Sequence, residues 1–142
     1  MELLKKENVQ ICDQAADWRD AIRTSILPLE KGGYVEARYK EEVIGNIEKL
    51  GPYIVIAEHV ALPHARPEQG AIRSQMAVTL FQKEVFFDGK EDGANLFISL
   101  AAADSSSHMD ALVAISELLS EEKDVEKILA SGNTDELYSY FH

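Results

Sequence analysis

Two histidines of this chain stand in surroundings that could support phosphate chemistry. The first, His64, follows the apolar run 60–63 and precedes the polar stretch 66–70. Pro63 fixes its own backbone φ and restricts the residue before it, so the approach to His64 is stiff. A histidine held at the end of a strand beside Arg66 suits the binding of an anion or a phosphate group. The other interpretation is a loop histidine that makes one backbone hydrogen bond.

The second histidine, His108, falls in the first turn of a predicted helix that follows Asp104. The N-terminus of a helix carries free N–H groups and a positive potential, which favour a neutral imidazole and attract anions. Ser106 and Ser107 add hydroxyl donors beside it. The alternative is an ordinary serine-capped helix with a surface histidine. His64 and His108 are 44 residues apart, so only the fold can bring them together.

The remaining candidate ligands do not form a metal-binding pattern. His59 lies beside Glu58 in a predicted turn, where an exposed histidine is expected, and His142 ends the chain. Cys12 is the only cysteine, so the sequence offers neither an internal disulfide nor paired thiolates for zinc. We therefore expect neither a metal ion nor a cofactor.

The charge balance narrows the classes of partner. The 142 residues include 25 acids and 14 bases, a net charge of −11, and residues 104–142 hold nine acids against two bases. This balance disfavours binding to nucleic acid or to an anionic membrane, and it permits a basic protein partner. No apolar run approaches the roughly 18 residues that span a bilayer, and the N-terminus lacks the layout of a signal peptide. We expect a cytoplasmic protein that does not insert into a membrane.

The apolar spacing predicts both strands and helices. Asp17 is placed to cap a helix from Trp18 to about Lys31, and a second helix is expected from Tyr39 to Leu50. Strands are predicted near 9–12, 53–57, 60–64, 75–81 and 96–101, and helices near 105–119, near 125–129 and after a cap at Thr134. The continuous apolar run 53–57 is typical of a strand that is buried on both faces. This order predicts one α/β domain over residues 1–142, a three-layer α/β/α sandwich with a mixed β-sheet.

The motif Ala61-Leu62-Pro63-His64-Ala65 resembles a signature of the phosphotransferase system (PTS). Enzyme IIA (EIIA) domains of the mannitol/fructose class share its Ala-aliphatic-Pro-His-small pattern. The wider stretch 50–70 and the phrase from Leu100 to His108 are most similar to the ascorbate-type branch of this class. The resemblance covers nearly the whole chain and identifies residues 1–142 as a type-2 EIIA domain with a three-layer fold.

This resemblance implies a role for each motif. His64 would accept a phosphoryl group from the phosphocarrier protein HPr and pass it to a IIB component, which in the ascorbate branch carries an acceptor cysteine. A IIC membrane transporter would be served indirectly. His108 would lie beside His64 and hydrogen-bond the phosphoryl oxygens. The residues themselves, rather than the resemblance, make Ser106, Ser107 and Arg66 candidates for further support. We therefore expect a phosphotransferase that works through a phosphohistidine and feeds sugar uptake, with ascorbate as the first candidate.

Several alternatives stay open from the sequence. A regulatory phospho-acceptor module that binds a target protein is the second candidate function, and an interaction domain with a structural histidine is the third.

Members of the mannitol and fructose type place an arginine late in the helix before the motif, and Arg38 and Lys40 lie in that region here. Asp104, Asp110 and Glu117 are expected to form an acidic rim that meets a basic face of HPr. A homodimer is compatible with the sequence.

Overall fold

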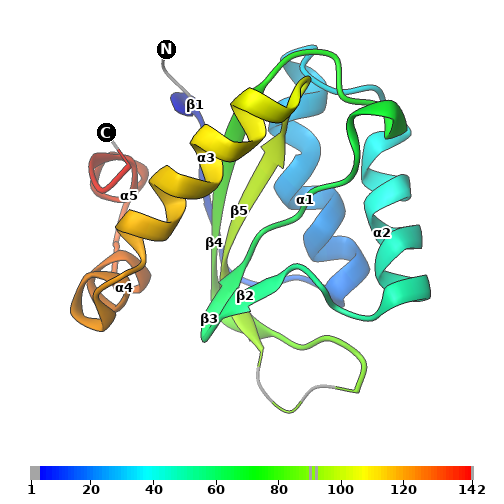
Figure 1. The fold of residues 1–142 in the computed structure, drawn as a ribbon. Coiled ribbons are helices and arrows are strands. Elements are labelled where there is room, and N and C mark those ends of the chain that lie inside the picture. Colours follow the sequence, from blue (N-terminus) through cyan, green and yellow to red (C-terminus); the bar gives the residue numbers. More distant parts are fainter. Residues whose placement is uncertain (1–3, 90, 92, 142) are drawn as a thin grey trace.

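The computed structural model describes residues 4–89, 91 and 93–141, apart from the side chains of residues 105, 107 and 122. Its centre is a sheet with the strand order β1-β4-β5-β3-β2 (Figure 1). The strands are β1 (Leu4–Cys12), β2 (Val55–Ala57), β3 (His59–Ala61), β4 (Gln75–Val85) and β5 (Ala94–Ala101). The pairs β1–β4 and β3–β5 are parallel, whereas β4–β5 and β2–β3 are antiparallel. The prediction of a mixed sheet is confirmed.

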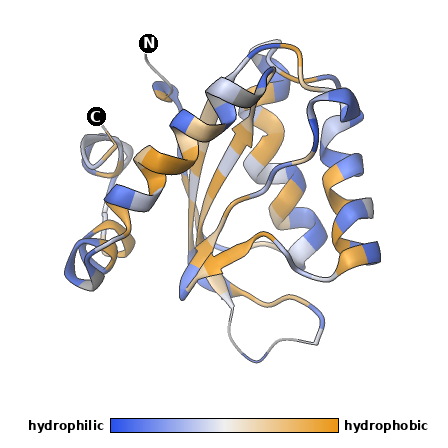
Figure 2. Cartoon of the chain, in the orientation of Figure 1, coloured by the Kyte–Doolittle hydropathy of each residue, from blue (hydrophilic) through white to orange (hydrophobic). Residues whose placement is uncertain are grey.

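Helices cover both faces of this sheet. On one face lie α1 (Trp18–Lys31) and α2 (Tyr39–Leu50), and on the other lie α3 (Ser105–Leu118), α4 (Glu122–Leu129) and α5 (Thr134–Ser139) (Figure 1). Figure 2 shows apolar residues concentrated on the strands and alternating with polar residues along α1 and α2. Helices that bury one apolar stripe against a sheet give this pattern. The three-layer α/β/α sandwich is confirmed.

The alternation of side chains along the strands decides which layer each residue meets. In β5, Ile98 and Leu100 pack in the core toward α3, whereas Phe97 packs in the core toward α1 and α2. Val60 and Leu62 likewise belong to the core toward α3. Because successive side chains of an extended chain point to opposite faces, position 64 is directed toward the same layer as position 62.

The apolar run 53–57 does not form the doubly buried strand that its composition predicts. Only Val55–Ala57 is a strand, and this β2 is the last in the strand order. Its partner is β3 alone, in a tight hairpin, and Ile56 is 44% exposed. A short apolar run therefore cannot tell a central strand from an edge strand, because burial depends on neighbours that the run does not contain.

Other boundaries also differ from the predictions. β3 ends at Ala61, so residues 62–65 continue as extended chain beyond the strand. β4 runs on to Val85, and Asn133 rather than Thr134 caps α5, because its side chain accepts the N–H of Glu136 at 2.8 Å. The predicted cap of α1 is confirmed. None of the described helices is long and apolar enough to cross a membrane.

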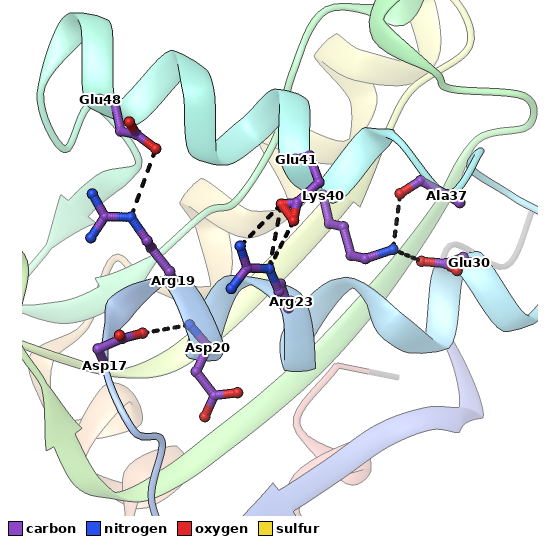
Figure 3. A network of polar contacts seen from close by, with 9 residues as sticks. All are labelled: Asp17, Arg19, Asp20, Arg23, Glu30, Ala37, Lys40, Glu41 and Glu48. Carbon is purple, nitrogen blue, oxygen red and sulfur yellow. Dashed lines mark hydrogen bonds and ion pairs between the residues drawn. The ribbon is translucent and has the colours of Figure 1, made fainter.

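Ion pairs join α1 to α2 across their outer surfaces (Figure 3). The Nε of Arg23 lies 2.9 Å from a carboxylate oxygen of Glu41, and the Nε of Arg19 lies 3.7 Å from one of Glu48. Exposed pairs of this kind contribute no more than about 1 kcal/mol each. Their position along both helices favours one orientation of α2, whose C-terminal end reaches the pocket described below.

Candidate active site

The first candidate, His64, lies on an extended segment that follows β3 along the end of β5. The parallel pairing of β3 with β5 ends with Ala61 opposite Phe97, and the same register carried three residues further sets His64 opposite Leu100. The N–H of Leu100 donates to the carbonyl oxygen of Pro63 at 2.9 Å, and the N–H of Leu62 donates to that of Ile54 at 2.7 Å. Hydrogen bonds on both sides therefore hold the backbone that leads into His64.

The imidazole of His64 is held in one tautomer. Its Nδ1 lies 2.6 Å from the carbonyl oxygen of Leu62. Because a carbonyl oxygen can only accept a hydrogen bond, Nδ1 carries the proton. The lone pair of the neutral ring is then at Nε2, the nitrogen at which this side chain can act as a nucleophile.

The surroundings also keep the His64 ring neutral. Burial of the half-buried side chain lowers the pKa of His64 below its ordinary value of 6.5. The bond to the carbonyl of Leu62 acts in the opposite direction, and the neighbouring His108 lowers this pKa further. A neutral imidazole with a free Nε2 is thus the form present at neutral pH.

The fold brings His108 beside His64. His108 lies in the first turn of α3, where its N–H donates to the carbonyl of Asp104 at 3.2 Å. The centroids of the two imidazole rings are 5.9 Å apart, and the ring planes are inclined by 51°. Both histidines line a surface pocket of about 640 Å³, together with Asn46, Lys49, Leu50, Tyr53, Arg66 and Asp104. Two segments that are distant in the sequence therefore form one site.

Tyr53 supports His64 in a way that the sequence did not predict. Its hydroxyl donates to the backbone carbonyl of His64 at 2.5 Å, and the two rings meet edge-on with centroids 5.3 Å apart. Burial raises the pKa of Tyr53, and a hydrogen bond with Asn46 opposes this rise. Apolar patterning treats Tyr53 as one more residue of the run 53–57. Its hydroxyl, in an otherwise aliphatic run, was the available signal.

Tyr39 is a second tyrosine that the sequence placed only on the apolar face of a helix. Its hydroxyl accepts the N–H of Ala65 at 3.0 Å and donates to the carbonyl of Leu100 at 2.8 Å. Burial raises the pKa of Tyr39 to about 12, so the hydroxyl keeps its proton at neutral pH. Tyr39 thus contacts the backbone directly after His64.

The two basic residues considered for the late-helix position do not reach the histidines. Arg38 contacts a carboxylate oxygen of Glu36 at 2.7 Å. Figure 3 shows the Nζ of Lys40 beside Glu30, from whose carboxylate it lies 2.5 Å. Both lie at the start of α2, and neither lines the pocket. Lys49, in the last turn of α2, lines it instead. The pocket lies at the C-terminal end of α2, so position along the helix, which the sequence alone does not relate to the pocket, explains this difference.

The supporting residues differ in where they lie. Arg66 lines the pocket, but its side chain is 74% exposed and its Nε lies 3.3 Å from a carboxylate oxygen of Glu68. Ser106 is exposed and is not among the pocket residues. The side chain of Ser107 lies outside the part of the chain that the structure describes. Their help to a bound phosphoryl group stays a prediction.

The expected acidic rim is only partly at the pocket. Asp104 lines it, and Asp110 is exposed on the first half of α3. Glu117 lines a different groove, beside Ile115 and Tyr140. Among the described residues, no group of three or more His, Cys, Asp or Glu side chains could hold a metal ion.

Comparisons with known proteins agree on one family. The family model described as "Phosphoenolpyruvate-dependent sugar phosphotransferase system, EIIA 2" matches residues 2–142. The mannitol-specific cryptic phosphotransferase enzyme IIA component of Escherichia coli (strain K12) is 36% identical over 132 residues, which cover 93% of this chain and 90% of that protein. The ascorbate-specific PTS system EIIA component of Shigella boydii serotype 4 (strain Sb227) is 27% identical over 137 residues, covering 95% and 89%.

A solved structure supports the same assignment. The complex of enzyme IIAMTL and phosphorylated enzyme IIBMTL from Escherichia coli contains a chain that is 27% identical to this one, with a TM-score of 0.85 and a coverage of 98% on each side. The likeness thus extends over the fold as well as the sequence. The family expected from the His64 motif is confirmed, and the chain belongs to the EIIA 2 family of the phosphoenolpyruvate-dependent sugar phosphotransferase system.

Proposed function

We propose that this chain is a cytoplasmic phosphoryl carrier for sugar uptake, which accepts a phosphoryl group from phospho-HPr on His64 and passes it to a IIB component. The observation that carries the proposal is the state of His64. The carbonyl of Leu62 holds Nδ1 as a donor, and Nε2 keeps its lone pair in a pocket shared with His108. The solved IIAMTL complex with phosphorylated IIBMTL supports IIB as the partner.

The reaction is an exchange of bonds to phosphorus. The lone pair of His64 Nε2 forms a bond to phosphorus while the bond from phosphorus to the donor histidine of HPr breaks, and the donor nitrogen recovers its electron pair. The ring of His64 gains positive charge in this step, and the Nδ1–H bond to Leu62 shares that charge. In the second step the acceptor nucleophile of IIB bonds to phosphorus, and the nitrogen–phosphorus bond of His64 breaks.

Several groups are placed to stabilise the transferred phosphoryl group. The ring of His108 lies next to that of His64, where a ring N–H can donate a hydrogen bond to a phosphoryl oxygen. The N-terminus of α3 adds a positive potential. Lys49 lines the pocket and, among the described residues, has no carboxylate partner. Lys49 is therefore the free cation that can approach the phosphoryl oxygens.

The sugar is a separate question, because the pocket contacts a phosphoryl group and a partner protein rather than the sugar. The mannitol-specific relative is 36% identical and the ascorbate-specific relative 27%. We therefore place a mannitol-type IIB first and an ascorbate-type IIB second as acceptors. A comparison of transfer rates to the two purified IIB proteins decides between them.

Radiolabelled phospho-HPr provides the test of the carrier function. The wild-type chain should take up the label and release it to a IIB protein, and His64→Ala should take up none. His108→Gln should retain uptake at a reduced rate. Full labelling of His64→Ala would overturn the proposal, whereas labelling without transfer to either IIB protein would favour the regulatory phospho-acceptor module.

A further inference from the structure

The backbone around His64 departs from a regular parallel pairing at one hydrogen bond. In a parallel ladder, a residue opposite Leu100 would be flanked by two bonds, one from the Leu100 N–H to the preceding carbonyl and one from the following N–H to the Leu100 carbonyl. The first bond is present, from Leu100 to Pro63 at 2.9 Å. In place of the second, the hydroxyl of Tyr39 lies between the N–H of Ala65 and the carbonyl of Leu100.

We propose that Tyr39 is a positioning residue, whose hydroxyl replaces one bond of the parallel pairing and thereby sets where His64 stands relative to His108. The inference rests on the proposed function, since it concerns how the phosphoryl-accepting ring is held. Tyr39 belongs to α2, on the opposite face of the sheet from α3. Its hydroxyl therefore reaches the plane of the sheet from the far side.

The hydroxyl of Tyr39 forms a bridge between the N–H of Ala65 and the carbonyl of Leu100, and it uses its proton in that bridge. It has one proton, and the carbonyl of Leu100 at 2.8 Å is a better acceptor than that of Ala65 at 3.4 Å. The side chain is 0% exposed, so water cannot take its place. Its backbone is also confined, since a side chain at Gly70 would come within 3.4 Å of the Tyr39 Cβ. An inserted hydroxyl holds the chain after His64 further from β5 than a direct bond would.

Leu100 connects this bridge to the second histidine. The chain runs from Leu100 through the end of β5 to Asp104, whose carbonyl accepts the N–H of His108 at 3.2 Å. The two segments that carry the histidines therefore meet at Leu100, once directly through Pro63 and once through Tyr39. A change at Tyr39 shifts the segment of His64 against that of His108.

Tyr39→Phe tests the proposal, with Tyr34→Phe as the matched control. Tyr34 is also a buried tyrosine, the neighbouring side chains of Lys5 and Gln75 lower its pKa, and it does not line the pocket. We expect Tyr39→Phe to slow uptake from phospho-HPr by about ten-fold to a hundred-fold, as for other small misplacements of reacting groups. Tyr34→Phe should stay within about two-fold of wild type, since it leaves that placement intact.

A spectroscopic measurement separates positioning from a loss of fold. In ¹H–¹⁵N spectra of the histidine rings, Tyr39→Phe should move the titration of His64 toward its ordinary value and change the ring shifts of both histidines. Wild-type uptake together with an unchanged His64 titration would overturn the inference. If phospho-HPr does not label the wild type, the proposed function fails, and the titration still decides the role of Tyr39.

The wild-type protein gives a second test should Tyr39→Phe fail to fold. The Ala65 amide should exchange slowly with solvent, although it lies in a loop. The Tyr39 hydroxyl proton should be visible by NMR and should show a cross-peak to that amide. Fast exchange of both protons would contradict the proposed bridge.

Discussion

Two histidines, one at the start of β3 and one beyond its end, differ in the groups that contact their ring nitrogens. His59, the first residue of β3, has its Nδ1 2.9 Å from an oxygen of Glu84 and its Nε2 3.5 Å from one of Glu58. His64, beyond the other end, has its Nδ1 on a backbone carbonyl and an imidazole, that of His108, as its neighbour. Carboxylates face both nitrogens of His59, whereas Nε2 of His64 stays available. What faces the second nitrogen thus decides whether a histidine can act as a nucleophile.

The backbones of the two histidines differ as well. His59 has a φ of 65°, and among the described residues no other side-chain-bearing residue has a positive φ. A left-handed conformation costs an L-residue roughly 1–2 kcal/mol. Its side chain lies against Glu84 of β4, so a contact between distant segments accompanies the strained turn. The histidine at the turn is tied to carboxylates and a strained backbone, and the one beyond the strand is the residue proposed to accept the phosphoryl group.

The largest effect expected from this comparison is that substitution of His64 abolishes phosphoryl uptake, whereas substitution of His59 does not. His64→Asn removes the nucleophilic nitrogen, so no label from phospho-HPr should remain on the protein. His59→Asn should leave uptake within about two-fold of wild type, because asparagine tolerates a positive φ and His59 does not line the pocket. The measurement is the rate of labelling at matched concentrations of folded protein. Equal losses in both variants would break the distinction between the two rings.

The helices and the candidate residues of this site could be predicted from the sequence more accurately than the tertiary contacts of those residues. The bounds of α1 and α2 follow from apolar spacing, which is a local signal. The partner of His59 is Glu84, 25 residues away, so its half-buried state could not be inferred from a local turn signal. The same reasoning explains why the run 53–57 was wrongly predicted to be buried on both faces.

The residues around His64 make contacts that the pattern of apolar and polar residues does not predict. The pairing of His64 with His108 was expected from the family resemblance, because a spacing of 44 residues carries no geometry of its own. Tyr39 was expected on the apolar face of the second helix and is buried there, but its hydroxyl bridges two backbone groups. Arg38 and Lys40 were considered because relatives place an arginine in this region, but both lie at the start of α2, and Lys49 near its C-terminal end lines the pocket.

A smaller effect is expected from the charged side chains around each histidine. Carboxylates face His59, whereas the positively charged Lys49 lines the pocket of His64. Lys49→Gln removes a positive charge from the lining of the pocket, and we expect uptake from phospho-HPr to slow by about ten-fold, the loss of roughly one charge-assisted hydrogen bond. Lys40→Gln is the matched control, since Lys40 lies on the same helix but contacts Glu30 and the carbonyl of Ala37. The same slowing in both variants would assign the effect to net charge rather than to the pocket.

The strain at His59 predicts a difference in stability between two small substitutions. Both His59→Gly and His59→Ala lose the contact with Glu84, but only glycine adopts a φ of 65° without a steric cost. The glycine variant should therefore be more stable than the alanine variant by about 1 kcal/mol. Urea unfolding of the two proteins measures this difference. An alanine variant as stable as the glycine variant would show that the turn relaxes and stores no strain.

The smallest effect concerns pH and comes from His64 itself. Burial holds the folded-state pKa of His64 below its ordinary value of 6.5, so as the pH falls through this value the unfolded chain binds a proton at this residue before the folded chain does. The free energy of unfolding must then decrease toward acid, and the neighbouring His108, which also lowers the pKa of His64, acts in the same direction. Above this range both states are neutral at His64 and the contribution vanishes. His64→Gln cannot titrate, so its unfolding free energy should fall less steeply than that of wild type between about pH 7 and pH 5. If the unfolding free energies of the two proteins changed with pH in parallel, the pKa of His64 would be the same in the folded and unfolded chains. The inference that its ring is held neutral by its contacts would then be contradicted.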